Sequence, residues 1–520
     1  MQIPLRRVDV AEFAEIPKTG PKPNATPPMN PDTFKSRRTF LGDTGMGVTG
    51  MALSAMLFRD GKAASPERIR LDAEPQFAAK AKSVIWIFNI GGVSHLESFD
   101  PKPMLNKYAG KSIDETPFAH ITDQERINKI LLDPKKSDRE VFKTILPLQT
   151  GYKKYGQSGI EVSDWFSHMG GVADELCVAR GMWTIDNNHG AQLTYHTGRK
   201  ISEGAFPTIG SWVSYGLGTL NKNLPEFVVL GNPSADCCGA AWTHGASYLG
   251  PQHAGVRMKV DPKNPLSFVR PADESLTPEE QRENFGLLGK LNRLSGIDYP
   301  DDAKLKARIK SYELAFEMQS AVPEVMDLQK EHPEIQKMYG LDQKETKPFA
   351  EKCLAARRLV ERGVRFVQIF HGYTGNAGGW DSHREIKKNH TLRSKQVDQP
   401  VAALIQDLKL RGLLDDTLVV WGSEFGRTPG ADMRGNQVGD GRDHHPHGFN
   451  VVMAGGGMKK GFVYGATDEL GFHAVENRHY VTDLHATVLH QMGVDPRSME
   501  VPGRKRLDRD FGEVMHGAIA

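Results

Sequence analysis

Short apolar runs bounded by glycine or polar residues recur along the chain and predict buried strands. These runs lie at residues 83–88, 176–182, 226–230, 364–370, 417–421 and 449–454. Helical spacing of apolar residues predicts helices at residues 191–196, 207–215, 348–362, 397–411 and 480–492. Strands that alternate with such helices indicate right-handed crossovers. The pattern therefore predicts an α/β fold with a mainly parallel sheet sandwiched by helices.

The pattern changes between about residue 236 and residue 340. Charge rises in this segment, and residues 303–318 place apolar positions at helical spacing among Lys and Glu. We interpret the segment as a helical insertion, packed on the sheet of one domain that spans residues 75–515. Its charged face is then the solvated face.

Composition narrows the classes of partner. The chain has 520 residues, enough for a large core, with 39% hydrophobic and 25% charged residues, as in folded soluble proteins. Its 66 basic and 64 acidic residues nearly balance, so no nucleic-acid partner is expected. The 4 Cys residues show no CxxC spacing and are too few for a disulfide framework.

Residues 1–64 have the character of a leader rather than of a folded domain. The segment is Pro-rich at its start, then carries Ser36-Arg37-Arg38-Thr39-Phe40-Leu41 and a weakly apolar stretch at residues 44–58. This order resembles a twin-arginine export signal, with cleavage near residues 63–64. The apolar stretch is too short to span a bilayer. We therefore expect no transmembrane segment and transfer by the twin-arginine export machinery to the periplasm or the cell exterior.

Acidic residues and histidines gather where the later strands are predicted to end. Glu424 follows the run at 417–421, and the loop after it carries an Asp and three His within residues 443–447. Asp381 and His383 follow the run at 364–370 and are two positions apart, so in an extended segment both side chains point the same way. In open α/β sheets, ligands bind at the carboxyl ends of the strands. We therefore hypothesise that these acids and histidines form a cation site.

Simpler interpretations of the same residues stay open. Asp381 and His383 are also compatible with a hydrogen-bonded pair on a surface loop, although their place at a strand end favours ligation. Glu424 could form a salt bridge with Arg427 or Arg442.

The order of motifs resembles the alkaline phosphatase and sulfatase superfamily. It comprises a strand followed by Gly91-Gly92, a helix closed by Thr197-Gly198-Arg199, an Asp/His loop, a strand ending in an acid before Gly426, and a His loop. Within that superfamily, the stretches at 91–103, 423–429 and 441–444 resemble the bacterial family known as domain of unknown function 1501. The resemblance covers roughly residues 80–515 and implies an alkaline-phosphatase-like fold.

The resemblance also implies a site for two divalent cations, chosen from zinc, manganese, magnesium and calcium, that positions a phosphate or sulfate ester. One cation would be held by Asp381, His383 and a His near 444, and the second would include Glu424. The residues carried over as metal ligands are Asp381, His383, Glu424, Asp443, His444, His445, Asn89 and Asp100. Asn89 stands where the superfamily has a first-strand Asp, and Asp100 or Glu97 are substitutes for it.

The chain departs from the superfamily at the expected nucleophile. That position falls on Asn188, which is not a nucleophile of this type, so His189 and Thr194 are the nearest candidates, with His189 a candidate base. Phe425 occupies a position where relatives have a ligand. Arg199 and His95 are candidates for binding the ester.

Two hypotheses of function follow. The first is an exported metal-dependent hydrolase of phosphate or sulfate esters, with a small-molecule or polymeric substrate. The second is a catalytically degenerate metal- or polyanion-binding protein on the same fold. Both require the 381/383 pair to lie within ligand reach of residues 444–447.

Overall fold

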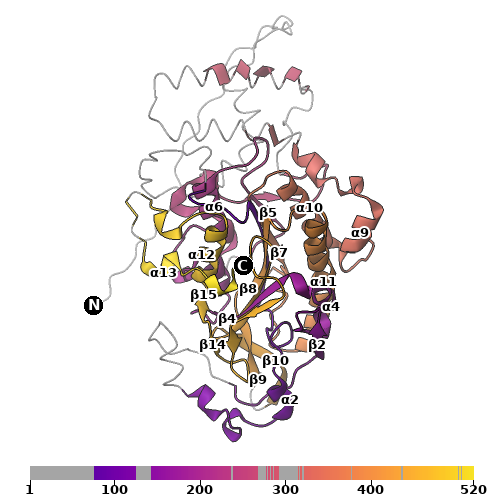
Figure 1. Ribbon diagram of the computed structural model, residues 1–520, viewed down its shortest axis with the longest axis vertical. Helices are drawn as coiled ribbons and strands as arrows, with labels where there is room; N and C mark the ends of the chain where they lie inside the picture. Colours follow the sequence, from indigo (N-terminus) through magenta and orange to yellow (C-terminus); the bar gives the residue numbers. More distant parts are fainter. Residues whose placement is uncertain are drawn as a thin grey trace, which may run out of the picture.

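The computed structural model describes residues 75–520, except 124–141, 236–237, most of 267–320, 376–377, 435–436, 502 and 505. The expected leader and most of the expected helix at 303–318 lie outside these residues. The described chain forms a sheet between two layers of helices (Figure 1). None of the helices described is both long enough and apolar enough to cross a membrane.

The central sheet has nine strands in the order β12-β4-β11-β8-β1-β7-β5-β6, with β15 beside β4. Its strands are β1 Ser83–Asn89, β4 Leu176–Trp183, β5 Phe227–Leu230, β6 Val256–Met258, β7 Phe366–His371, β8 Thr417–Ser423, β11 Phe449–Ala454, β12 Phe462–Tyr464 and β15 His479–Tyr480. Every neighbouring pair is parallel except the two pairs that involve β11. The predicted mainly parallel α/β sheet is therefore confirmed. A hairpin precedes β11, so no crossover helix forces it to run parallel to β8.

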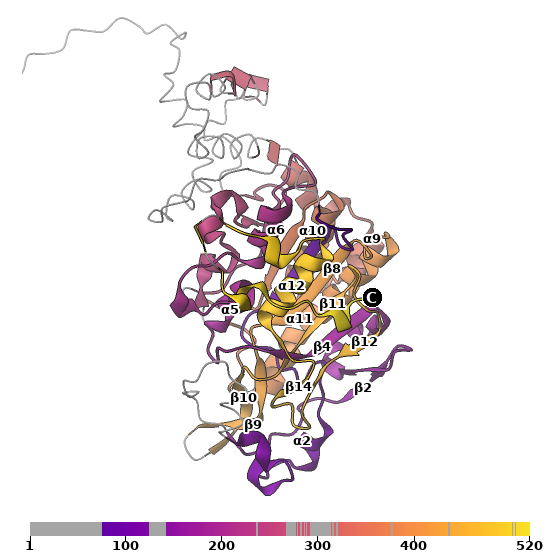
Figure 2. The same ribbon diagram turned by 60° about the vertical axis from the view of Figure 1, so that its left-hand side comes forward.

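Helices cover both faces of the sheet (Figures 1 and 2). The helices are α2 Pro103–Lys107, α4 Ser167–Gly171, α5 Ala191–Thr197, α6 Ile209–Leu217, α9 Pro333–Tyr339, α10 Lys347–Glu361, α11 Ile386–Leu410, α12 Val481–Gln491 and α13 Asp508–Phe511. Successive side chains of β1 enter different cores: Ile85 packs with the α10 and α11 side, and Trp86 with the α6 and α12 side. Burial on both faces explains why the strands are continuous apolar runs.

Two segments differ from the expectations. Residues 426–445, expected as a loop, form an antiparallel hairpin of β9 Gly426–Arg434 and β10 Gln437–His445, with register shifts along it. Pro429 and several glycines hide the alternation that marks a strand. Within the expected insertion, β6 extends the main sheet beside β5, so the sheet continues past residue 236. Two further small sheets pair β2 Tyr152–Tyr155 with β3 Ile160–Ser163, and β13 Ala466–Thr467 with β14 Ala474–Glu476.

Candidate metal centre

The site lies at the carboxyl edge of the central strands. There Asn89, the last residue of β1, pairs in register with His371 of β7 and Ser423 of β8. The segments after β4, β7 and β8 leave from this edge and carry His189, Asp381 with His383, and Glu424 respectively. The β9–β10 hairpin adds His444. Segments far apart in the sequence thus supply one cluster of side chains.

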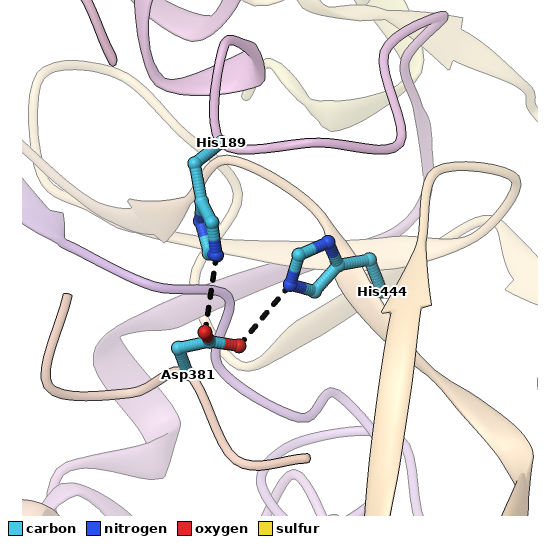
Figure 3. Close-up of side chains that lie close together, drawn as sticks. All are labelled: His189, Asp381 and His444. Atoms are coloured by element: carbon cyan, nitrogen blue, oxygen red, sulfur yellow. Dashed lines mark hydrogen bonds and ion pairs between the residues drawn. The ribbon is translucent and has the colours of Figure 1, made fainter. Parts of the chain in front are cut away.

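Three ligand-type atoms converge in this cluster. Asp381 Oδ1, His383 Nε2 and His444 Nε2 each lie 3.1 Å from the other two. Figure 3 shows the carboxylate of Asp381 facing both His189 and His444. The required closeness of the 381/383 pair to the His cluster is therefore present.

In both His383 and His444, the ring nitrogen that points away from the cluster, Nδ1, faces an oxygen. His383 Nδ1 lies 2.6 Å from Asp432 Oδ2, and His444 Nδ1 lies 2.9 Å from the carbonyl oxygen of Asn187. Carboxylate and carbonyl oxygens only accept, so each Nδ1 donates its hydrogen. Each Nε2 then presents a lone pair to the centre.

Two lone pairs and a carboxylate oxygen this close together repel one another unless a positive charge lies between them. Ligands of tetrahedral zinc, at metal distances near 2.0–2.2 Å, are about 3.3–3.6 Å apart, a few tenths of an ångström more than the spacing of the three atoms here. Within the described residues, two groups of three could hold a metal ion: His189, Asp381 and His444, and His383, Asp443 and His444. The donor set therefore fits a divalent cation.

The centre opens to solvent on one side. The side chains of Asp381 and His383 are 20% and 21% exposed, whereas those of His189 and His444 are 9% and 1% exposed. A ligand from solvent would thus meet Asp381 and His383 first.

At Asp381 and His444 the electrostatics favour the protonation states that metal ligands need. Burial acts to raise the pKa of Asp381, but contacts with His189, His383 and His444, and the charge of Arg427, hold that pKa far below its usual range. Burial lowers the pKa of His444 well below its ordinary value. An ionised carboxylate and a neutral imidazole are the forms that bind metal ions. For His189, burial acts to lower the pKa, and contacts with Asp381 and Glu424 outweigh it and raise the pKa.

Glu424 is fully buried behind His189. Its carboxylate accepts hydrogen bonds from the backbone N–H of Gly91 at 2.9 and 3.1 Å, from Ser423 Oγ at 2.9 Å and from His189 Nδ1 at 3.2 Å. The salt bridge to Arg427 or Arg442 considered for Glu424 is not formed. Those arginines pair instead with Asp381 at 2.9 Å and with Glu97 at 2.6 Å, respectively.

Arg427 ties together the segments that carry the centre. Its buried guanidinium donates to Asp381 Oδ1 and to the carbonyl oxygens of Gly91, Gly92 and Arg442. Gly91 has a φ of +117°, and a Cβ placed on it would lie 2.5 Å from the backbone nitrogen of Asp381. Only glycine allows the loop after β1 to approach Asp381 this closely.

Two of the predicted histidines have their rings engaged elsewhere. His445 Nε2 contacts the carbonyl oxygen of Phe472, because adjacent residues of a strand point to opposite faces and His444 already faces the centre. His95 Nε2 donates to the carbonyl oxygen of Gly471 at 2.8 Å. Both rings are buried. Neither belongs to the cluster around Asp381.

Two predicted charged residues are held in ion pairs. Asp100, expected as a metal ligand, lies 3.0 Å from Lys102 Nζ and 3.5 Å from Arg180 Nε. Arg199, expected to bind the ester, lies between Glu203 at 2.7 Å and Asp510 at 2.6 Å. The structure therefore brings neither side chain to the cluster.

The residues near the expected nucleophile lie at different depths. Asn188 is exposed, and its Oδ1 accepts the backbone N–H of His189 at 2.8 Å. Thr194 is fully buried on α5. Asn89 donates its Nδ2 to the carbonyl oxygen of Gly422 at 3.1 Å, at the end of β1. Of the candidates near the expected nucleophile, His189 is the one whose side chain reaches Asp381.

Two contributors to the site were not predicted in these roles. Asp432 contacts His383 from the hairpin, and Arg427 contacts Asp381 rather than Glu424. A strand assignment for residues 426–445 would have pointed to Asp432, because it would have brought residues on both sides of the turn next to His444.

Solved structures that resemble this chain include Ps i-CgsB in complex with k-i-k-neocarrahexaose, at 12% identity and a TM-score of 0.33, covering 67% of this chain and 69% of that chain. The lipoteichoic acid synthase LtaP from Listeria monocytogenes is similar at 10% identity and a TM-score of 0.32, covering 76% and 84%. The PsFucS1 sulfatase from Pseudoalteromonas sp. is similar at 14% identity and a TM-score of 0.29, covering 64% and 63%. No curated protein matches the chain. The family model described as Protein of unknown function (DUF1501) matches residues 81–519, so the chain belongs to that family.

Proposed function

We propose that the protein is a divalent-metal-dependent hydrolase of phosphate or sulfate esters that acts in the periplasm or outside the cell after twin-arginine export. The observation that carries the proposal is the convergence of Asp381 Oδ1, His383 Nε2 and His444 Nε2 at 3.1 Å spacing. The order of sequence motifs supports the ester class, and the arginine pair at 37–38 supports export.

The donor set favours particular ions. Two imidazole nitrogens and one carboxylate suit zinc or manganese better than magnesium or calcium, which prefer oxygen ligands. When bound, such an ion would act as a Lewis acid on an ester oxygen. The ester would enter from the solvent-exposed side of Asp381 and His383. The buried guanidinium of Arg427 fixes the position of Asp381 through its ion pair with Oδ1.

One observation favours the alternative, a metal-binding protein without catalysis. Asn188 occupies the position where the superfamily resemblance places a nucleophile, and its side chain folds back on the N–H of His189. A metal centre without an activated side-chain nucleophile is what a degenerate member of such a superfamily would retain.

The test compares metal content and turnover in the same samples. Protein purified without chelator is assayed by elemental analysis and with nitrophenyl phosphate, bis-nitrophenyl phosphate and nitrophenyl sulfate. We expect bound metal and turnover of at least one substrate, with both lost in Asp381→Ala and retained in Asp440→Ala, which changes an exposed Asp of the β9–β10 hairpin. Metal without turnover would favour the binding protein, and absence of metal would contradict both functions.

A further inference from the structure

We infer that the centre holds one divalent cation rather than two, and that His189 is a ligand of that cation, oriented by Glu424. The inference rests on the proposed metal site. It changes the role of His189 from a base to a ligand and the role of Glu424 from a second-cation ligand to a positioning residue.

The first step concerns His444. Both groups of three residues able to hold a metal ion, among the residues described, include His444. Its Nδ1 donates to the carbonyl oxygen of Asn187, so Nε2 is the one nitrogen left for a cation. One lone pair binds one ion. The two groups are therefore alternative views of a single centre, not two centres side by side.

The second step concerns Glu424, which belongs to neither group. Oε1 of Glu424 accepts hydrogen bonds from the N–H of Gly91 and from His189 Nδ1. Oε2 accepts from the same N–H of Gly91 and from the hydroxyl of Ser423. The carboxylate is fully buried, and both of its oxygens already accept hydrogen bonds. Glu424 thus faces protein donors on both oxygens, and no group of described residues able to hold a metal ion includes it, so we assign it the role of an acceptor rather than a ligand of a second ion.

The third step concerns His189, whose side chain is 9% exposed. With Nδ1 donating to Glu424, the neutral ring, which is the form that binds a cation, carries its lone pair on Nε2. Nε2 is buried and lies 3.2 Å from Asp381 Oδ2, and no hydrogen bond forms between these two atoms. Figure 3 shows this nitrogen and that of His444 both directed at the carboxylate of Asp381. A buried imidazole nitrogen and a carboxylate oxygen this close together, without a hydrogen bond between them, are placed to bind one cation together.

The three histidines thus follow one rule. Each has its Nδ1 fixed by an oxygen, from Glu424, Asp432 or the backbone of Asn187, and each directs its Nε2 to Asp381. Oxygen partners of this kind set the tautomer and orientation of metal-binding imidazoles. Asp443, the other residue of the two groups, lies 3.5 Å from His383 Nδ1, on the side of the ring that faces Asp432. Without it the centre has three nitrogens and one carboxylate, the number of ligands that a single tetrahedral ion takes.

The test measures stoichiometry, affinity and a spectrum, none of which needs turnover. Metal-free protein is titrated with zinc in competition with a chromogenic chelator and, separately, with cobalt followed by visible absorption. We expect one equivalent per chain. His189→Ala should weaken zinc binding by more than about 100-fold and alter the cobalt spectrum, and Glu424→Gln should weaken it by about 10-fold. The exposed His120→Ala variant is the matched control and should leave both readouts unchanged.

The outcomes separate the inference from the proposed function. Two equivalents in the unmodified protein, one of them lost in Glu424→Gln, would overturn the single centre while leaving a metal-dependent hydrolase intact. An unchanged affinity and cobalt spectrum in His189→Ala would overturn the ligand role alone. No binding to the unmodified protein would contradict both proposals. Circular dichroism and thermal unfolding of each variant show that the differences do not arise from unfolding.

Discussion

Replacing Asp432 by Ala should weaken metal binding without touching a metal ligand. Asp432 is 4% exposed, and its Oδ2 lies 2.6 Å from His383 Nδ1, a short charge-assisted contact. Loss of such a partner typically costs 10- to 100-fold in metal affinity, which is about 1.4–2.7 kcal/mol. Asp443 Oδ1 lies 3.5 Å from the same nitrogen and can replace part of the lost contact. We therefore expect the single variant near the 10-fold end of the range.

Zinc competition with a chromogenic chelator measures this effect, with Asp440→Ala as the control from the same hairpin. The double variant Asp432→Ala/Asp443→Ala should approach the 100-fold end, because His383 then has neither carboxylate beside Nδ1. Equal affinity in Asp432→Ala and the unmodified protein, with similar thermal stability, would refute the role assigned to this carboxylate.

Three further changes test the framework around the centre. Glu97→Ala leaves the fully buried Arg442 without its carboxylate and should lower the free energy of unfolding in urea by about 3–5 kcal/mol. The double variant Glu97→Ala/Arg442→Met should lose less, because no charge is then left buried and unpaired. Equal losses in the single and the double variant would contradict the pairing. Burial lowers the pKa of His485 to about 4, so the folded protein favours the neutral ring. The resulting stability, up to about 3 kcal/mol, is fully present above about pH 6.5 and is lost as the pH falls to 4. His485→Gln should flatten that pH dependence of the unfolding free energy, and an unchanged slope would count against the assignment. Gly91→Ala should displace the backbone at Asp381, lowering stability by at least about 1 kcal/mol and weakening zinc binding; unaltered binding would show that the loop yields without moving the ligand.

The strands could be predicted because they are buried on both faces and therefore form uninterrupted apolar runs. The long helix α11 shows the limit of that signal. Apolar spacing predicted a start at residue 397, but the helix begins at Ile386. Its first turns bury His390 and Ser394, and polar residues at buried positions give no hydrophobic period.

The site residues that follow strand ends could be predicted from the sequence. The contacts that depend on the β9–β10 hairpin could not. Asp381, His383 and His444 were identified because acids and histidines after parallel strands converge at one edge. His445 was grouped with His444 because residues 443–447 were interpreted as a loop, and only the strand geometry of β10 turns the two rings apart. Arg199 has the right charge for an anion, but its partner Asp510 lies too far along the chain for sequence spacing to reveal it.

The assembly of the centre from distant segments has a consequence for how the chain folds. The ligand atoms come together only when the loops after β4 and β7 and the β9–β10 hairpin are all in place, so an unfolded chain offers a metal ion no comparable site. Free metal at 100 times its dissociation constant would then add about 2.7 kcal/mol to the stability of the native state. If the proposed centre binds its ion, the melting temperature should rise with the concentration of the free ion and fall when a chelator removes it.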